Sequence, residues 1–216
     1  MARVREKDEV ADREFILNIA ASLIRQHGFK GMTTRKIAQA CGMLPGSLHY
    51  RYRTKEAIVV DLMKLAMERS TSAIELACQG IDDPLLRVRM GLRAHLETLV
   101  NGNDIVYVLL FEWRSLEGQA RAEMIALRDE YEQFWLGMIK GVQDLGLLRR
   151  DLSVSLLKLL SFGAVNWVAT WYRPSGAMTL DQIADTIWVM VTQGVLVPEA
   201  HELAEASRYP SGVPSV

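Results

Sequence analysis

Apolar residues recur every three or four positions along most of this chain, the spacing that gathers them on one face of an α-helix. In the first quarter the pattern predicts an amphipathic helix that ends at Gly28, followed by two short helices. Beyond it the pattern predicts six more helices, over residues 55–79, 84–100, 105–116, 119–145, 154–172 and 180–196. We find no convincing alternation of apolar and polar residues of the kind that marks a half-buried strand. The sequence therefore predicts an all-α protein.

The segment at residues 33–52 predicts two short helices around a tight turn. Thr33 or Thr34 can cap the first helix, because a threonine hydroxyl accepts a hydrogen bond from a backbone N–H that the first turn leaves unpaired. Gly42 suits the left-handed position that ends this helix. Pro45 suits the first position of the second helix, where its missing N–H would have no partner.

The second short helix has two different faces. Leu48 and Tyr52 lie four residues apart and are expected to point inward. The outward face is short, polar, aromatic and basic, and consists of Ser47, His49, Tyr50 and Arg51. Such a face suits a helix that enters the major groove of DNA. We expect His49 and Tyr50 to contact bases or sugars, and Arg51 and Lys55 to contact phosphates.

These positions resemble the signature of the TetR family of transcriptional regulators. The matching residues are Thr34, Arg35, Ile37 and Ala38 in the first helix and Gly46, Ser47, Leu48, Tyr52, Thr54 and Lys55 after the turn. The chain departs from the signature at Leu44, Pro45, His49, Arg51 and Arg53, and these departures concern base preference rather than fold.

The resemblance implies an N-terminal three-helix head and a C-terminal helical domain. It places a helix-turn-helix DNA-binding domain at residues 10–55, a linking helix at 55–80, a ligand-binding and dimerisation domain at 81–206 and a loose tail at 207–216. The residues expected to contact operator DNA are Thr33, Thr34, Arg35, Leu44, Pro45, Gly46, Ser47, His49, Tyr50, Arg51 and Lys55. Such a regulator works in the cytoplasm, most often as a repressor.

Charge is distributed unevenly along the 216 residues. Between residues 13 and 55 there are eight lysines and arginines against one glutamate, which gives about +7. The whole chain carries −1, so the remainder carries about −8. A basic head on an acidic body is the electrostatic pattern of a protein that docks one end on nucleic acid.

Other features favour a reduced environment without a membrane. The only two cysteines, Cys41 and Cys78, fall on apolar faces, as buried thiols do, rather than in a disulfide pattern. No apolar run approaches the ~20 residues that span a bilayer. The charged start of the chain has no apolar segment behind it, so we do not expect a secretory signal.

The last two long helices, at residues 153–172 and 180–196, are more apolar than one buried stripe requires. Their surplus apolar surface predicts a partner. In the TetR family the last two helices pair with their copies, so we expect a homodimer through these two segments.

The sequence offers no convincing catalytic or metal site. The four histidines are scattered, without the spacing of a zinc site. Glu112 on an apolar helix, with His95 or Arg114 beside it, could act as a general acid or base, but a hydrogen-bonded structural carboxylate is the favoured interpretation. We therefore expect no metal, no cofactor and no enzymatic activity.

Bulky residues in the C-terminal part predict an effector cavity. The candidate ligand-binding residues are Tyr107, Phe111, Arg114, Met138, Trp167, Trp171 and Arg173. The runs Asn166-Trp167 and Trp171-Tyr172-Arg173-Pro174 resemble TetR-type regulators of fatty-acid, acyl-CoA and steroid catabolism. That resemblance implies a hydrophobic or amphipathic effector such as an acyl-CoA. The two tryptophans and Arg173 would hold its adenine and a phosphate, and Phe111 and Met138 its acyl chain.

The interpretation that follows is a DNA-binding repressor released by its effector through a population shift. Two other classes stay open. One is a helical ligand-binding module without DNA affinity, and the other is an enzyme that acts on a hydrophobic small molecule.

Overall fold

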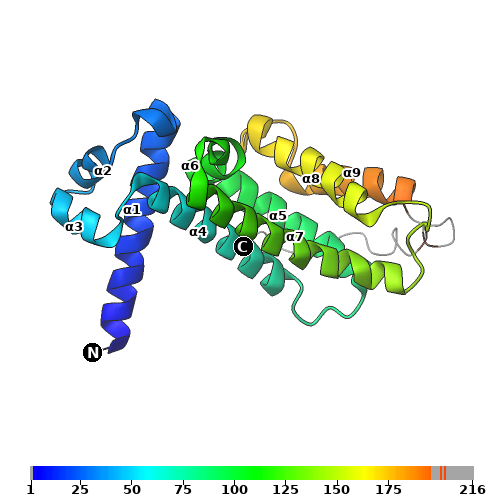
Figure 1. Ribbon diagram of the computed structural model, residues 1–216. Coiled ribbons are helices and arrows are strands. Elements are labelled where there is room, and N and C mark those ends of the chain that lie inside the picture. Colours follow the sequence, from blue (N-terminus) through cyan, green and yellow to red (C-terminus); the bar gives the residue numbers. More distant parts are fainter. Residues whose placement is uncertain (1, 196–199, 201, 203–216) are drawn as a thin grey trace. The chain divides into compact units, whose positions relative to one another are not determined.

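The computed structural model describes residues 2–195, 200 and 202, and helices account for its regular structure (Figure 1). The α-helices are α1 (Ala2–Gly31), α2 (Thr34–Ala40), α3 (Pro45–Arg51), α4 (Lys55–Ala77), α5 (Pro84–Asn101), α6 (Asn103–Tyr107), α7 (Gly118–Asp144), α8 (Val154–Trp171) and α9 (Leu180–Val195). A π-helical turn, Val108–Glu112, and a 3-10 turn, Trp113–Ser115, follow α6. No β-strand occurs in the described residues, so the all-α prediction is confirmed. The tail expected at residues 207–216 lies outside the described residues.

The first helix differs from the prediction at its start. Residues 2–9, which precede the DNA-binding domain expected at residues 10–55, are the first turns of α1. This segment is rich in arginine, lysine and glutamate, which favour helices in their own right. The predicted end is confirmed, because Gly28 has φ 68° and ψ 165° and breaks the helical geometry before the last three residues.

The chain folds into two compact units. The head unit contains residues 1–69 and 102–130, and the body unit contains residues 70–101 and 131–216. Helices α4 and α7 therefore each pass from one unit into the other. The sequence boundary near residue 81 did not anticipate that residues 102–130 pack with the head.

The head unit has one continuous apolar core. Helix α1 contributes Ile16, Leu17 and Ile24, each no more than 1% exposed. They pack with residues from α2, α3 and α4 and with four residues of the later segment, namely Ile105, Val108, Leu116 and Met124. The predicted amphipathic face of the first helix is thus the centre of this core.

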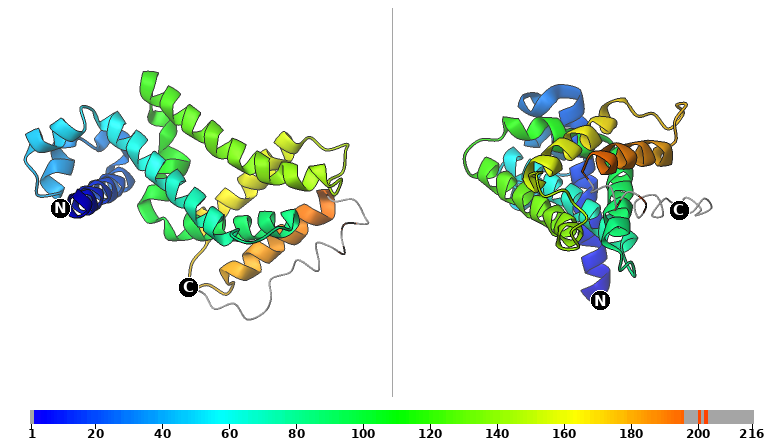
Figure 2. Two further views of the ribbon diagram at one scale, coloured as in Figure 1. Left: turned by 90° about the horizontal axis from the view of Figure 1, so that it is seen from below. Right: turned by 90° about the vertical axis from the view of Figure 1, so that its right-hand side faces the viewer.

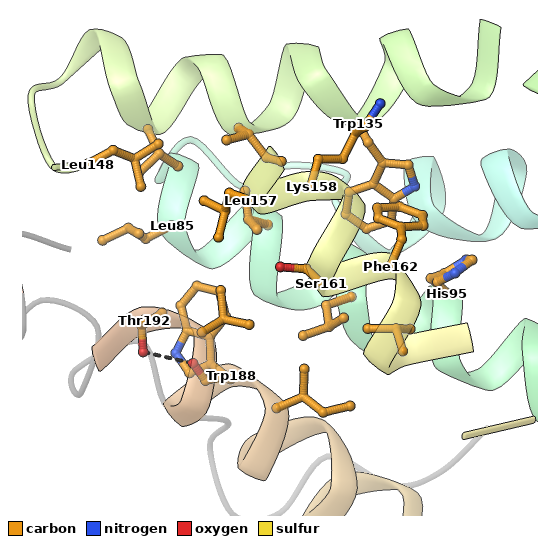
Figure 3. Close-up of a pocket in the computed structure, with 17 residues that line it drawn as sticks. Leu85, His95, Trp135, Leu148, Leu157, Lys158, Ser161, Phe162, Trp188 and Thr192 are labelled. Carbon is orange, nitrogen blue, oxygen red and sulfur yellow. Dashed lines mark hydrogen bonds between the residues drawn. The ribbon is translucent and has the colours of Figure 1, made fainter. Parts of the chain in front are cut away.

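In the body unit, α5 packs against both α8 and α9. Figure 2 shows α8 in yellow and α9 in orange beside α5 from two further sides. Gly91 on α5 allows a close approach, because a Cβ there would lie 2.9 Å from the Met138 methyl group on α7. The guanidinium of Arg89, 4% exposed, donates a 2.5 Å hydrogen bond to Asp185 on α9. Helices α5, α7, α8 and α9 surround an apolar cavity (Figure 3).

Candidate DNA-reading helix and effector cavity

The helix-turn-helix forms as the local sequence predicts. The hydroxyl of Thr33 accepts a hydrogen bond from the Lys36 N–H and caps α2. Gly42 takes the left-handed conformation at φ 67°, and Pro45 occupies the first turn of α3. The turn is therefore fixed by residues whose backbone preferences match their positions.

Helix α3 presents the predicted outward face to solvent. Leu48 and Tyr52 are 1% and 7% exposed, whereas Tyr50 is 88% exposed. Of the eleven residues expected to contact DNA, Thr34 and Lys55 are half-buried and the other nine are exposed. They gather on α2, α3, the turn between these helices and the start of α4. Whether each one contacts DNA stays a prediction.

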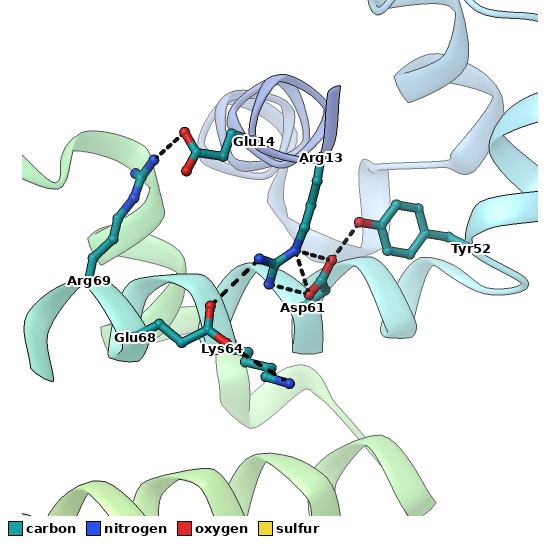
Figure 4. Close-up of polar contacts among 7 residues, drawn as sticks. All are labelled: Arg13, Glu14, Tyr52, Asp61, Lys64, Glu68 and Arg69. Carbon is teal, nitrogen blue, oxygen red and sulfur yellow. Dashed lines mark hydrogen bonds and ion pairs between the residues drawn. The ribbon is translucent and has the colours of Figure 1, made fainter. Parts of the chain in front are cut away.

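A polar cluster anchors the end of α3 to α1 and α4 (Figure 4). The hydroxyl of Tyr52 donates to the Asp61 carboxylate at 2.5 Å, and Nη2 of Arg13 donates to the same carboxylate at 2.7 Å. Burial alone would raise the pKa of Asp61, but the hydrogen bonds from Arg13 and Tyr52 outweigh it, so this pKa lies below its usual value. The positive charge of Arg13 is therefore paired with the Asp61 carboxylate within the head unit.

Lys55 also has an internal role. Its ammonium donates to the backbone oxygens of Phe29 at 2.9 Å and Met32 at 3.4 Å, and it lies 4.2 Å from the centre of the Phe29 ring. These contacts tie the start of α4 to the turn that precedes α2. An ammonium has three N–H donors, so this arrangement leaves one donor for a DNA phosphate.

Glu112 is a structural carboxylate, as favoured from the sequence. Its Oε2 accepts a hydrogen bond from the backbone N–H of Phe29 at 3.4 Å. Neither suggested partner bonds to it among the contacts of the described residues. Arg114 lies over the Trp113 ring at 5.0 Å, and His95 has its own hydrogen bonds within the body unit. The acid–base interpretation of Glu112 gains no support from this geometry.

The body-unit cavity has a volume of about 90 Å³. Its wall is mostly aliphatic and aromatic, with Trp135 from α7, Phe162 and Val165 from α8, and Ile187 and Trp188 from α9. Ser161 on α8 also lines the cavity (Figure 3). Such a cavity can bind an apolar group. It disfavours an ion, because a buried charge without an oppositely charged or hydrogen-bonding partner loses its hydration.

None of the seven predicted ligand-binding residues lines this cavity. Tyr107, Phe111 and Arg114 belong to the head unit, where Arg25 covers the Tyr107 ring at 4.0 Å. Met138 packs in a neighbouring cluster with Trp135. Trp167 and Trp171 are 64% and 43% exposed on α8, and Arg173 is exposed after it. Effector contacts by these residues stay a prediction.

Sequence reasoning missed most of the cavity wall. None of the candidate ligand-binding residues lines it, and the apolar surplus of the last two helices was assigned to a dimer. The available signal was the apolar surplus itself, because α8 and α9 carry more apolar residues than one buried stripe requires. One side, with Leu157, Ser161 and Trp188, lines the cavity instead.

A buried polar cluster connects the cavity wall to α4. His95, which lines the cavity, has Nδ1 2.8 Å from the Tyr131 hydroxyl and 3.2 Å from the Ser70 hydroxyl, and Nε2 3.3 Å from Asn166 Oδ1. Burial lowers the pKa of His95 to about 4, so the ring is neutral at pH 7. Among the described residues no group of histidine, cysteine and carboxylate side chains could hold a metal ion.

The opposite face of α8 is apolar and uncovered in the single chain. Leu156, Leu159 and Leu160 are 54%, 62% and 66% exposed, and Met190 on α9 is 59% exposed. Within the described part of the chain, α8 is the helix long and apolar enough to cross a membrane, yet only 17% of it is buried. A face of this kind needs a partner.

Comparisons with known proteins agree with this geometry. A family model described as "Bacterial regulatory proteins, tetR family" matches residues 16–62, and one described as "Tetracyclin repressor-like, C-terminal domain" matches residues 82–195.

Similar proteins span nearly the same length. The HTH-type transcriptional repressor KstR2 of Rhodococcus jostii is 31% identical over 199 residues, which cover 86% of this chain and 92% of that protein. AibR, solved in complex with isovaleryl coenzyme A and operator DNA, is 28% identical with a TM-score of 0.72, covering 83% of this chain and 97% of its own. PfmR of Thermus thermophilus is 26% identical with a TM-score of 0.70, over 82% and 97% of the two chains.

Regulators of the TetR type bind operator DNA as homodimers and respond to small molecules. The matched models, the relative at 31% identity and the exposed face of α3 agree on this assignment. The chain therefore belongs to the TetR family of DNA-binding transcriptional regulators.

Proposed function

We propose that this protein is a cytoplasmic repressor whose body-unit cavity takes the acyl group of an acyl-CoA effector. The observation that carries the proposal is the apolar cavity of about 90 Å³ among α5, α7, α8 and α9. Two relatives support it by what they are named for, since KstR2 is named a repressor and AibR was solved with isovaleryl coenzyme A and operator DNA.

The volume of the cavity sets the size of the group that enters it. An apolar protein cavity of about 150 Å³ holds benzene. A cavity of about 90 Å³ therefore suits an acyl chain of a few carbons better than a fused ring system. The CoA part of the effector would stay outside this space.

The contacts of His95 offer a route from effector to DNA. His95 lines the cavity and lies within hydrogen-bond distance of Ser70 on α4. The same helix continues into the head unit, where Asp61 and Lys55 hold the end of α3 and the turn before α2. An acyl group that displaces the cavity wall would thus favour a different setting of α4.

The two reading helices of a dimer enter successive major grooves about 34 Å apart, so a shift of a few ångströms lowers affinity. The uncovered apolar surface of α8 and α9, predicted from the sequence as a dimer interface, supports pairing through these helices. Release from the operator is then a shift in population between two conformations of the dimer, which differ in the spacing of the two reading helices.

A cavity-filling substitution tests the location of the effector. Ser161→Leu adds apolar atoms inside the cavity, whereas Ser161→Ala removes only the hydroxyl and serves as the matched control. We expect isovaleryl-CoA to bind the alanine variant as it binds the wild type, and the leucine variant at least tenfold more weakly. Operator binding without effector should be equal in all three proteins.

The readouts are calorimetry for the thioester and fluorescence anisotropy for DNA. Equal isovaleryl-CoA affinity in the leucine and alanine variants would place the effector outside the cavity. The thioester should be recovered intact after incubation, because the protein acts as a regulator and not as an enzyme. Steady hydrolysis of the thioester would overturn that part of the proposal.

A further inference from the structure

An apolar side chain is exposed at the start of the DNA-reading helix. Leu44 is the N-cap residue of α3 and is 76% exposed. The preceding residue, Met43, packs against the head core, whereas Leu44 is not among the described residues of this core. An aliphatic side chain stabilises a fold when it leaves water, and Leu44 makes no such contribution in the single chain. Its isobutyl group is therefore available to a molecule outside the chain.

Leucine also does not stabilise the helix end at which it lies. An N-cap side chain normally accepts a hydrogen bond from a backbone N–H of the first turn, which favours serine, threonine, asparagine and aspartate. Thr33 caps α2 in this way, but Leu44 has no acceptor in its side chain and makes no such bond. Neither helix capping nor burial within the chain explains a leucine at this position.

The residues that follow Leu44 in the first turn of α3 are small. A Cβ at Gly46 would meet no heavy atom within 4 Å, and the backbone there is not left-handed. The fold therefore does not require glycine at this position, although glycine weakens a helix relative to alanine. Ser47 is also small and is exposed. Small side chains here allow another surface to approach the first turn of α3 closely.

The surface that approaches this turn is the major groove of operator DNA. In helix-turn-helix proteins the N-terminal residues of the second helix contact base edges there. These edges present hydrogen-bond donors and acceptors and one apolar group, the C5 methyl group of thymine. A leucine placed against a donor or acceptor would remove its water without replacing the hydrogen bond. Against the methyl group, both apolar surfaces leave water, which is favourable.

We infer that Leu44 reads one thymine in each operator half-site through the C5 methyl group of the base. This contact distinguishes thymine from cytosine, because cytosine has no methyl group at that position. The chain departs from the TetR signature at Leu44, so the contact belongs to this chain rather than to the family as a whole. The inference rests on the DNA binding of the family and does not depend on the effector.

Uracil tests the inference, because it is thymine without the methyl group. Duplexes carry the operator site that the protein selects from a random library, with deoxyuridine replacing one thymidine at the same position in both half-sites. Wild-type affinity is measured by fluorescence anisotropy. Loss of one buried methyl group lowers affinity about fourfold, so a dimer should lose about fifteenfold at the thymine that Leu44 contacts. A half-site without thymine, or a loss below about twofold at every thymine, would overturn the inference.

Leu44→Ala assigns the effect to this side chain. The variant lacks most of the isobutyl group, so it should bind the thymine and uracil duplexes about equally at that position. Leu76→Ala is the matched control, because Leu76 on α4 is a leucine of similar exposure, 73%, and this variant should keep the wild-type preference. An unchanged preference for thymine in Leu44→Ala would assign the methyl contact to another residue and contradict the inference.

Leu44→Ser separates recognition from folding. Serine supplies the N-cap acceptor that leucine lacks, so the melting temperature should stay the same or rise. The preference for thymine over uracil should be lost, as in the alanine variant. A serine variant that keeps this preference would contradict the inference. A lowered melting temperature would also contradict it, because Leu44 would then stabilise the fold.

Discussion

The Tyr52 hydroxyl donates a 2.5 Å hydrogen bond to the Asp61 carboxylate, which fastens the residue that ends the DNA-reading helix to the helix that leads into the body unit. Arg13 of α1 donates hydrogen bonds to the same carboxylate through Nε and Nη2. The Asp61 carboxylate of α4 therefore accepts hydrogen bonds from α1 and from the end of α3.

Replacing Asp61 by asparagine should destabilise the protein in a pH-dependent way. The pKa of Asp61 lies below its usual value because the hydrogen bonds from Arg13 and Tyr52 outweigh its burial. A lowered folded-state pKa contributes stability above the unfolded pKa of about 3.9, and this stability is lost as pH falls through the folded value. With allowance for partial exposure, we expect a loss of about 1–2 kcal/mol at pH 7 that shrinks below pH 4.

Urea unfolding between pH 3 and pH 7 measures this difference. Asp144→Asn is the control, because Asp144 is an exposed carboxylate paired with Lys140 four residues away, and its loss should cost less than about 0.5 kcal/mol. A constant difference between wild type and Asp61→Asn down to pH 3 would show that the charge of Asp61 does not matter.

Lys55→Ala should affect both stability and DNA affinity. Removal of the ammonium leaves the Phe29 and Met32 oxygens without this donor, so we expect a loss of about 1 kcal/mol in the free energy of unfolding. If the third N–H binds a phosphate, affinity should fall for all DNA sequences and the salt slope should decrease by about one unit.

The exposed Arg35 on α2 separates these two effects. Arg35→Ala should lower the salt slope in the same assay while leaving the melting temperature unchanged. A Lys55→Ala protein with reduced stability and an unchanged salt slope would mean that Lys55 only holds the turn.

Leu160→Glu should convert the protein to a monomer. Leu160 is 66% exposed on the apolar face of α8, and burying a carboxylate against a second copy is costly. Analytical ultracentrifugation at micromolar concentration gives the mass. Gln143→Glu adds the same charge at an exposed position of α7 and should leave the dimer intact. A monomeric wild type, or a dimeric Leu160→Glu, would contradict pairing through α8.

His95→Gln should remove a specific part of the acid sensitivity. Because the folded pKa of about 4 lies below the unfolded value of about 6.5, the unfolded chain binds more protons between these limits. Wild-type stability should therefore fall from pH 6.5 toward pH 4, by up to about 1.4 kcal/mol per pH unit more than in the variant. Thermal unfolding across this range measures it. His49→Gln, at an exposed ring, should leave the wild-type profile unchanged.

The sequence predicted the helix-turn-helix in detail because each residue that fixes its backbone acts on its near neighbours in the chain. Thr33 caps, Gly42 turns and Pro45 starts a helix through interactions within four residues of themselves. The exposed face of α3 could also be predicted, because residues three or four positions apart lie on the same face of a helix. Most helix ends were also predicted within two residues, since glycine, proline and capping residues mark them.

The cavity could not be predicted in the same way. Trp188 and Ser161 share it only because α8 and α9 pack around α5 at a particular rotation, which no local pattern encodes. The same holds for the segment at residues 102–130, whose Val108 and Met124 join the head core from far along the chain. Trp167 and Trp171 satisfied a local pattern for ligand binding, yet they face solvent in the single chain.

One titration tests the central claim, that a DNA-reading dimer is released by an acyl thioester. A site selected from a randomised duplex library should be palindromic, with half-sites about 10 base pairs apart. On that labelled duplex, fluorescence anisotropy should show tight binding that Tyr50→Ala abolishes without a change in melting temperature. Isovaleryl-CoA should raise the Kd at least tenfold, and isovalerate with free CoA should not. Selection of no common sequence, or a Kd that no acyl-CoA changes, would contradict the account.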